Sequence, residues 1–89
     1  MTKPGRIPCA VLGCKRTAPA DKHPDGTRIC CRQCWRLSAR ATRDRYRAAV
    51  RTLRRFTEET STWRTLLFVV QGAFDDAVRE ATEARAGLL

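Results

Sequence analysis

The chain has 89 residues and a formal net charge of +9, with 43% hydrophobic and 30% charged residues. This length fits one small domain, and such domains often need a metal or disulfides because they bury little apolar surface. No apolar run approaches the length of a membrane span, since residues 66–70 form only a short one, and we expect no membrane partner.

The positive charge is concentrated in the first part of the chain. Residues 1–56 carry fifteen Lys and Arg against three Asp and Glu, whereas residues 57–89 carry three Arg against six acids. A strongly basic segment indicates an anionic partner. Nucleic acid is the commonest partner of this kind, and an acidic protein surface is the other candidate.

Residues 1–8 contain Pro and Gly and are predicted to form a flexible basic lead. A first cysteine pair follows, Cys9 and Cys14. Gly13 can supply the unusual backbone angle that a tight turn between the two sulfurs requires. Two cations come directly after Cys14, and cations beside thiolates lower the thiol pKa and offset negative charge.

Residues 17–28 are predicted to form a loop or a short hairpin, because His-Pro-Asp-Gly at residues 23–26 fits a β-turn. Residues 27–30 include β-branched side chains and are predicted to return as a short strand. This strand leads into a second cysteine pair, Cys31 and Cys34, at the start of a predicted helix.

Two close cysteine pairs separated by sixteen residues predict a tetrahedral site for one structural Zn²⁺ ion, with the ligands Cys9, Cys14, Cys31 and Cys34. Four protein ligands leave no open position for a substrate. Either Cys30 or His23 could replace one of these ligands. The odd number of cysteines and the polar start of the chain favour a reducing, cytoplasmic compartment and metal ligation over disulfides.

Residues 32–56 lack Gly and Pro and predict one amphipathic helix. Its apolar or small residues recur at spacings of four and three. The opposite face repeats this spacing with the arginines Arg32, Arg36, Arg40, Arg43, Arg47, Arg51 and Arg54. Because Arg binds phosphate bidentately and stacks on bases, these seven residues are the predicted nucleic-acid-binding surface.

Residues 57–62 are rich in N-cap residues and acids, so a second amphipathic helix is predicted over 57–86. A bend within one long helix is the alternative. The apolar face of residues 63–81 either packs on the rest of the chain or forms a homodimer. Gly72 lowers helix propensity and would permit close approach of a partner helix, and Gly87 fits the end of the helix.

The aromatic residues Trp35, Tyr46, Trp63 and Phe74 could stack on bases. All four lie on the predicted apolar faces, so packing in the core is the preferred interpretation. The chain contains no catalytic set: it has one histidine, no phosphate-binding glycine pattern and no paired carboxylates beyond Asp75 and Asp76. We therefore expect no enzyme.

The order of Cys-x-x-x-Gly-Cys, a loop with His-Pro-Asp-Gly-Thr, and Cys-x-x-Cys-Trp-Arg resembles the treble-clef-type zinc fingers of small phage and prophage proteins. The resemblance covers roughly residues 7–50 and implies a zinc knuckle, a β-hairpin and a helix with the second ligand pair. Cys34 stands where such relatives often carry His. Some relatives attach this finger to a His-Asn-His nuclease, but a chain with one histidine cannot supply that site.

The sequence thus predicts a small metal-stabilised, α-rich (α+β) domain, with a treble-clef-like zinc finger over residues 9–36 that continues into a two-helix hairpin. The predicted function is zinc-dependent nucleic-acid binding, with DNA as the first candidate. The alternative is a phage-type adaptor or inhibitor that binds an acidic host protein. A phage-encoded protein of this kind would act in the host cytoplasm.

Overall fold

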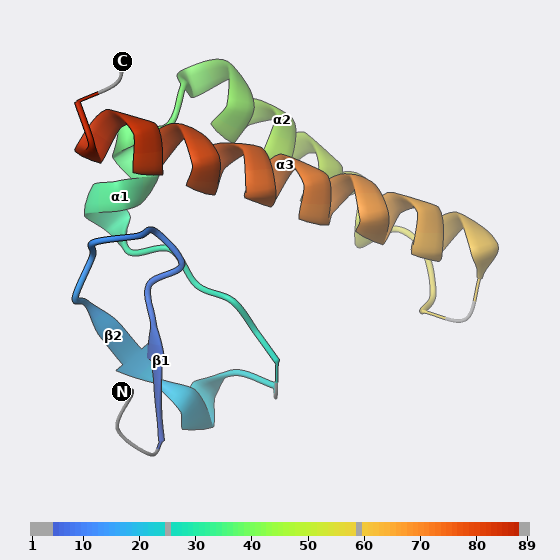
Figure 1. The fold of residues 1–89 in the computed structure, drawn as a ribbon. Coiled ribbons are helices and arrows are strands. Elements are labelled where there is room, and N and C mark those ends of the chain that lie inside the picture. The colour runs from blue at the N-terminus through green and yellow to red at the C-terminus, as the bar shows by residue number, and fades with distance from the viewer. Residues whose placement is uncertain (1–4, 25, 59, 88–89) are drawn as a thin grey trace.

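The computed structural model describes residues 5–24, 26–58 and 60–87. Two short strands are followed by three α-helices, and the long last helix runs beside the other two (Figure 1). In chain order the elements are β1 (Arg6–Pro8), β2 (Thr17–Pro19), a 3₁₀ turn η1 (Ala20–Lys22), α1 (Arg32–Leu37), α2 (Arg40–Leu53) and α3 (Ser61–Arg85). Within the described residues, no helix is both long and apolar enough to cross a membrane.

The hairpin is built from the strands on either side of the first cysteine pair. β1 and β2 pair in antiparallel register, with Ile7 opposite Ala18. The flexible lead predicted over residues 1–8 is therefore wrong for β1, while residues 1–4 lie outside the described residues. The strand predicted over residues 27–30 is reduced to one parallel bridge between Cys9 and Ile29. The chain beyond η1 returns as a loop, in which the Ile29 carbonyl accepts a 2.8 Å hydrogen bond from the Ala10 N–H.

The single helix predicted over residues 32–56 is divided in two. Ser38 and Ala39 are extended, with ψ angles of 159° and 142°, although neither is Gly or Pro. The Ser38 hydroxyl donates a 2.6 Å hydrogen bond to the Trp35 carbonyl, which ends α1. A serine side chain that bonds nearby backbone competes with helix continuation in this way. This break separates the predicted arginine series into two helices.

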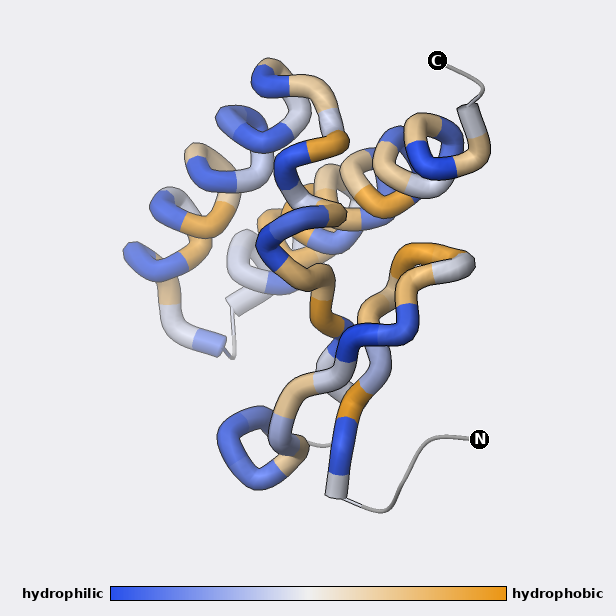
Figure 2. The backbone as a smooth tube through the Cα atoms, turned by 90° about the vertical axis from the view of Figure 1, so that its left-hand side faces the viewer, coloured by the Kyte–Doolittle hydropathy of each residue, from blue (hydrophilic) through white to orange (hydrophobic). Residues whose placement is uncertain are grey.

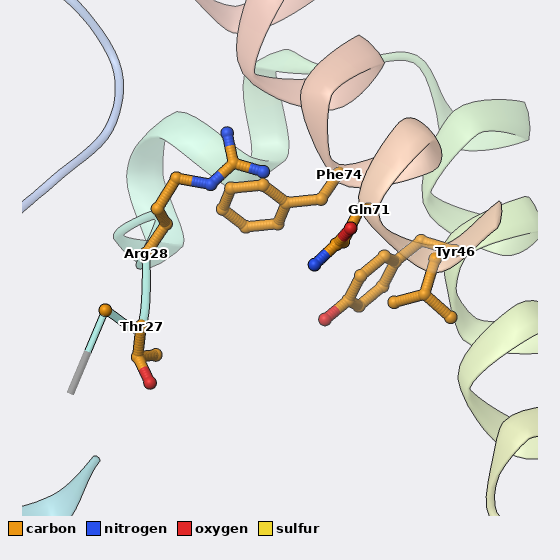
Figure 3. A pocket seen from close by; sticks show the side chains of 7 residues that line it. Thr27, Arg28, Tyr46, Gln71 and Phe74 are labelled. Atoms are coloured by element: carbon orange, nitrogen blue, oxygen red, sulfur yellow. The ribbon is translucent and has the colours of Figure 1, made fainter. Parts of the chain in front are cut away.

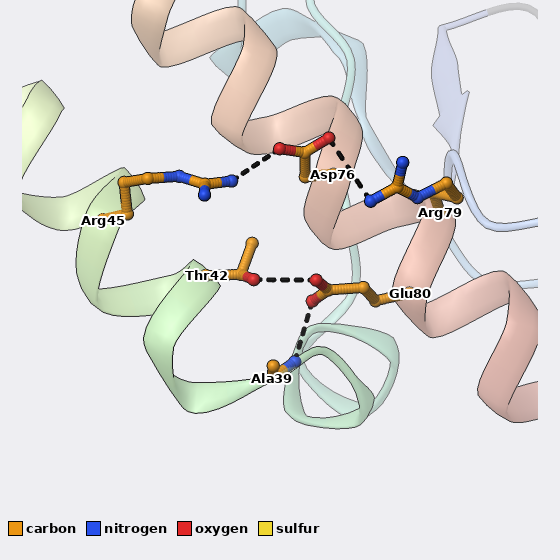
Figure 4. Close-up of polar contacts among 6 residues, drawn as sticks. All are labelled: Ala39, Thr42, Arg45, Asp76, Arg79 and Glu80. Carbon is orange, nitrogen blue, oxygen red and sulfur yellow. Dashed lines mark hydrogen bonds and ion pairs between the residues drawn. The ribbon is translucent and has the colours of Figure 1, made fainter. Parts of the chain in front are cut away.

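The start of α2 is stabilised by a carboxylate from α3. Glu80 accepts hydrogen bonds from the Ala39 N–H at 2.9 Å and from the Thr42 hydroxyl at 2.8 Å (Figure 4). A capping residue usually comes from the same helix, and Ala39 at the N-cap position has no side chain for this role. Glu80 also places its negative charge at the positive end of α2. A contact that is remote in sequence therefore fixes the break between α1 and α2.

The helices pack through small side chains. Ala73, Ala77 and Ala81 are buried at intervals of four residues on α3, beside α1 and α2. Such small residues let helix backbones approach closely. Gly72, expected at the close approach, is instead exposed and has no neighbour within 4 Å of its missing Cβ. Part of the predicted face over residues 63–81 is thus used within the chain, and dimerisation through it stays a prediction.

The break predicted at residues 57–62 is a boundary between two separate helices rather than a bend within one. α2 ends at Leu53, and α3 begins at Ser61. The Thr60 hydroxyl accepts a 3.1 Å hydrogen bond from the Trp63 N–H and so caps α3. At the other end, Gly87 has φ +77°, which fits the predicted helix end. A second long helix is therefore present, and its start at Ser61 is the last position of the range 57–61 in which the sequence places it.

Replacement of Glu80 by Ala should lower the free energy of unfolding by about 1–2 kcal/mol, because α2 loses its N-terminal acceptor. Chemical denaturation followed by circular dichroism measures this loss. Glu83, one turn further along α3, is the matched control, and Glu83→Ala should cost less than about 0.5 kcal/mol. Equal losses in the two variants would contradict the capping role.

Gly72→Ala should raise the free energy of unfolding by about 0.5–1 kcal/mol, since alanine has the higher helix propensity and its methyl group meets nothing. The same substitution at Gly87 should destabilise the protein, because its positive φ disfavours a Cβ. Thermal unfolding of both variants tests this opposite pair of signs. A destabilising Gly72→Ala would mean that another element occupies this face of α3.

Candidate metal centre and arginine-rich surface

Four cysteine side chains converge where the β1–β2 connection meets α1. The Sγ atoms of Cys9, Cys14, Cys31 and Cys34 all lie within 4.8 Å of one another. The first two come from the turn after β1, and the other two come from the start of α1 (Figure 1). The predicted convergence of these four residues is confirmed. Neither Cys30 nor His23 belongs to the cluster formed within the described part of the chain.

The first pair is held by a tight turn. The Cys14 N–H donates to the Val11 carbonyl at 3.2 Å, and Gly13 between them has φ +86°. This angle is rarely adopted by residues with a side chain, so the predicted role of Gly13 is confirmed. Val11 is only 2% exposed and anchors the turn in the small core. The turn therefore presents both sulfurs toward α1.

The sulfur separations fit a tetrahedral metal site. A tetrahedron with metal–sulfur bonds near 2.3 Å has sulfurs about 3.8 Å apart. The sulfurs of Cys14 and Cys31 are 3.7 Å apart. Cys34 is fully buried and Cys9 is 7% exposed, whereas Cys14 and Cys31 are partly exposed, so one side of the cluster is shielded from water. Four converging thiols with this spacing can hold one metal ion and leave no position open.

The thiols of the cluster differ in their readiness to lose a proton. Burial pushes the pKa of Cys31 upward, but hydrogen bonds from the Cys34 backbone N–H and from neighbouring thiols outweigh it and lower this pKa to about 7. Burial, together with hydrogen bonding to the Cys31 thiol, raises the pKa of Cys34 well above the usual range. Of these two thiols, Cys31 therefore loses its proton more readily than Cys34, and a metal ion would replace the proton that Cys34 retains.

Cys30 has a different environment from its neighbour. Burial is the main cause that raises the pKa of this thiol to about 12, and the nearby Cys9 adds to the shift. Its Sγ lies 3.7 Å from the Cys31 carbonyl oxygen and packs against the edge of the cysteine cluster. Cys30 thus behaves as a small apolar residue beside the cluster.

Arg85 connects the far end of the chain to the cysteine cluster. Its Nη1 lies 4.0 Å from the Cys34 Sγ, and its Nη2 donates to the Gly13 carbonyl at 3.4 Å. Four thiolates around a divalent ion leave a net charge of roughly −2, which a guanidinium offsets. The sequence predicts this role for Lys15 and Arg16, which are both exposed, and the structure adds Arg85 as a further cation beside the sulfurs. Sequence spacing gave no signal for a partner 51 positions away from Cys34.

The predicted arginine series is distributed over two helices. Arg32 and Arg36 belong to α1, four of the others lie on α2, and Arg54 is the C-cap residue of α2. In Figure 2 the hydrophilic positions recur along the outer edge of α2, away from the other helices. We call this set the α2 arginine face; it consists of Arg40, Arg43, Arg47, Arg51 and Arg54. All are exposed except Arg43, which is partly buried and has an Nε atom with no hydrogen-bond partner in the described structure.

Few acids neutralise the α2 arginine face. Asp44 lies 3.9 Å from Arg40 and 3.7 Å from Arg47, and these exposed pairs are long and weak. Arg45 points elsewhere and pairs with Asp76 of α3. Within the described residues, Arg51 makes no ion pair. The outer side of α2 therefore carries concentrated positive charge.

Three of the four aromatic residues considered for base stacking, Trp35, Tyr46 and Phe74, form one cluster. The Trp35 ring lies 5.1 Å from the Tyr46 ring in an edge-to-face arrangement and 6.1 Å from the Phe74 ring in a stacked one. This packing agrees with the predicted core role. None of the three side chains is fully buried, however, and Arg28 lies 4.9 Å from the Phe74 ring centre. Arg28 was not among the predicted site residues.

Comparison with protein-family models, curated proteins and solved structures finds no match to this chain. The function must therefore be argued from the cysteine cluster and the surfaces around it.

Replacement of Arg85 by Met should lower metal affinity about tenfold, because the cluster loses a charge-balancing hydrogen bond. Competition with a chromophoric chelator measures this affinity. Arg79→Met is the matched control, since Arg79 lies on the same helix and pairs with Asp76 instead. Affinity that falls equally in both variants would show a general charge effect rather than a contact with Cys34.

Proposed function

We propose that the four cysteines bind one structural Zn²⁺ ion. Thiolate sets of this size favour zinc, and a closed tetrahedral site has no position for catalysis. The ion would join the β1–β2 connection to α1, and Arg85 would extend this junction to α3. We interpret the order of turn, loop and ligand-bearing helix as a treble-clef-like finger. The resemblance to phage-type fingers stays a prediction from the motif.

We infer that the zinc-stabilised domain binds nucleic acid, with DNA as the first candidate. The observation that carries this inference is the α2 arginine face. A fourteen-residue helix is roughly 20 Å long and can follow several phosphates of a duplex. Five arginines with one acid among them provide bidentate phosphate donors along this length. Solubility alone does not require this excess of arginine over acidic residues, because the surfaces of ordinary soluble proteins mix positive and negative side chains.

The zinc ion should be lost as the pH falls. Protons compete for thiolates, so acidification weakens zinc binding and the finger unfolds with its metal. Zinc affinity must fall as the pH falls, because zinc binding releases protons from the thiols. Titration from neutral to acidic pH, with zinc release followed by a colorimetric chelator and folding by circular dichroism, tests this coupling. Cys31→Ser/Cys34→Ser should bind no zinc at neutral pH. Full zinc content in that variant would refute the site.

Binding to duplex DNA should weaken steeply with salt, because phosphate contacts release counterions. Fluorescence anisotropy of a labelled duplex across a salt series measures the slope of log affinity against log salt. Arg47→Gln/Arg51→Gln should lower affinity at least about tenfold and reduce the slope by about two. The zinc-loaded protein is used throughout.

Arg64→Gln/Arg79→Gln on α3 is the matched control, since it removes the same charge from another helix. Its affinity should stay within about threefold of the unmodified protein, because both arginines lie off the α2 arginine face. An equal loss of DNA affinity in both double variants would indicate that binding depends on the net charge of the protein rather than on the α2 arginine face. Absence of binding at low salt would overturn the nucleic-acid proposal and leave an acidic protein surface as the remaining partner class.

A further inference from the structure

A hollow opens beside the aromatic cluster, between residues 26–28 and the facing sides of α2 and α3. Its volume is about 310 Å³, and its lining includes Arg28, Tyr46, Gln71 and Phe74. Figure 3 shows the Tyr46 hydroxyl and the Gln71 amide directed into the open space that separates them from Thr27. A hollow of this size lies at the lower end of the range for small-molecule sites, roughly 300–1,000 Å³.

The rings at this hollow are not equally available. The Phe74 ring already has two close neighbours, the Arg28 guanidinium at 4.9 Å and the Trp35 ring at 6.1 Å. The Tyr46 ring meets Trp35 edge to face and stays partly exposed. Within the described residues its hydroxyl makes no hydrogen bond to another side chain. Tyr46 is therefore the ring that a flat ligand can reach.

Arg28 is held in place before any ligand arrives. Its Nη1 pairs with the Asp75 carboxylate at 2.5 Å, and its guanidinium plane lies over Phe74 (Figure 3). The pair uses one of the five N–H donors of the guanidinium, and its side chain remains 51% exposed. An anchored guanidinium with free donors can bind a phosphate with little loss of side-chain entropy.

The Gln71 amide is the remaining polar group of the hollow, and it can hydrogen-bond to the edge of a nucleobase. Gln71 lies on an exposed position of α3, and its amide offers both donors and an acceptor. Together the hollow provides an aromatic face, an amide and an anchored cation. Proteins that bind single strands combine the same elements, namely stacking rings with cations that contact the backbone.

We propose that this hollow binds a nucleotide with an unpaired base, which stacks on Tyr46, bonds to Gln71 and places its phosphate on Arg28. This inference deepens the proposed nucleic-acid function and rests on it. It assigns single-stranded segments, rather than only the duplex backbone, as ligands. A base in a strand and a free mononucleotide share this chemistry, and the test separates them.

The test compares a short labelled DNA strand with the same strand annealed to its complement, using the zinc-loaded protein. The main variant is Arg28→Gln/Asp75→Asn, which removes the guanidinium without changing net charge. Gln71→Ala is the second variant, because an exposed helix position tolerates alanine. Zinc content and thermal unfolding confirm that both are folded. Each variant should lose about tenfold in single-strand affinity, while duplex affinity changes less than about twofold.

Arg47→Gln/Arg51→Gln provides the contrast and should weaken both forms of DNA. If single-strand affinity is unchanged in both hollow variants, the nucleotide site is wrong, although the arginine-face function stands. If the unmodified protein binds no nucleic acid, that function fails, and the hollow is then tested by NMR titration with a mononucleotide. Shifts of Tyr46 and Gln71 that vanish in the main variant would support a free-nucleotide site, and their absence would overturn it.

Discussion

The convergence of four cysteine sulfurs holds together parts of the chain that have little else in common. The hairpin and the loop to α1 bury few apolar side chains. Cys9, Val11 and Cys34 are the buried residues there, and in the described part of the chain no larger apolar side chain than Val11 is fully buried. A small domain with so little apolar burial needs another source of stability. With a metal ion bound, the cysteine cluster would supply it, since each pair comes from a different segment.

α3 is the element that connects this cluster to the rest of the protein. Its alanine stripe packs on α1 and α2, and Glu80 sets where α2 begins. Its last turn brings Arg85 to the sulfurs and to the turn that carries Cys9 and Cys14. One helix therefore packs on both other α-helices and reaches the turn between β1 and β2 (Figure 1). Changes at the metal centre and changes in helix packing are expected to affect each other.

The charge asymmetry of the sequence is partly used inside the fold. The acids of α3 pair with arginines beside them on the surface: Asp75 with Arg28, and Asp76 with Arg45 and Arg79. These contacts divide the arginines into a structural set and an outward set. The α2 arginine face keeps its charge because the acidic helix lies on the opposite side of α2. This division is the physical basis for proposing an external anionic partner.

The sequence alone determined the local chemistry of this protein. Cysteine spacing identified the four sulfurs that meet, Gly13 identified the tight turn, and periodicity identified an α3 that begins late but is otherwise as expected. It could not find the break at Ser38 and Ala39, because no Gly or Pro marks it and the acceptor that stabilises it, Glu80, lies about forty residues away. The contact of Arg85 with the cysteine cluster and the hollow beside Arg28 could not be predicted for the same reason. Spacing and periodicity report neighbours along the chain, whereas caps, charge balance and cavities depend on which distant side chains the fold brings together.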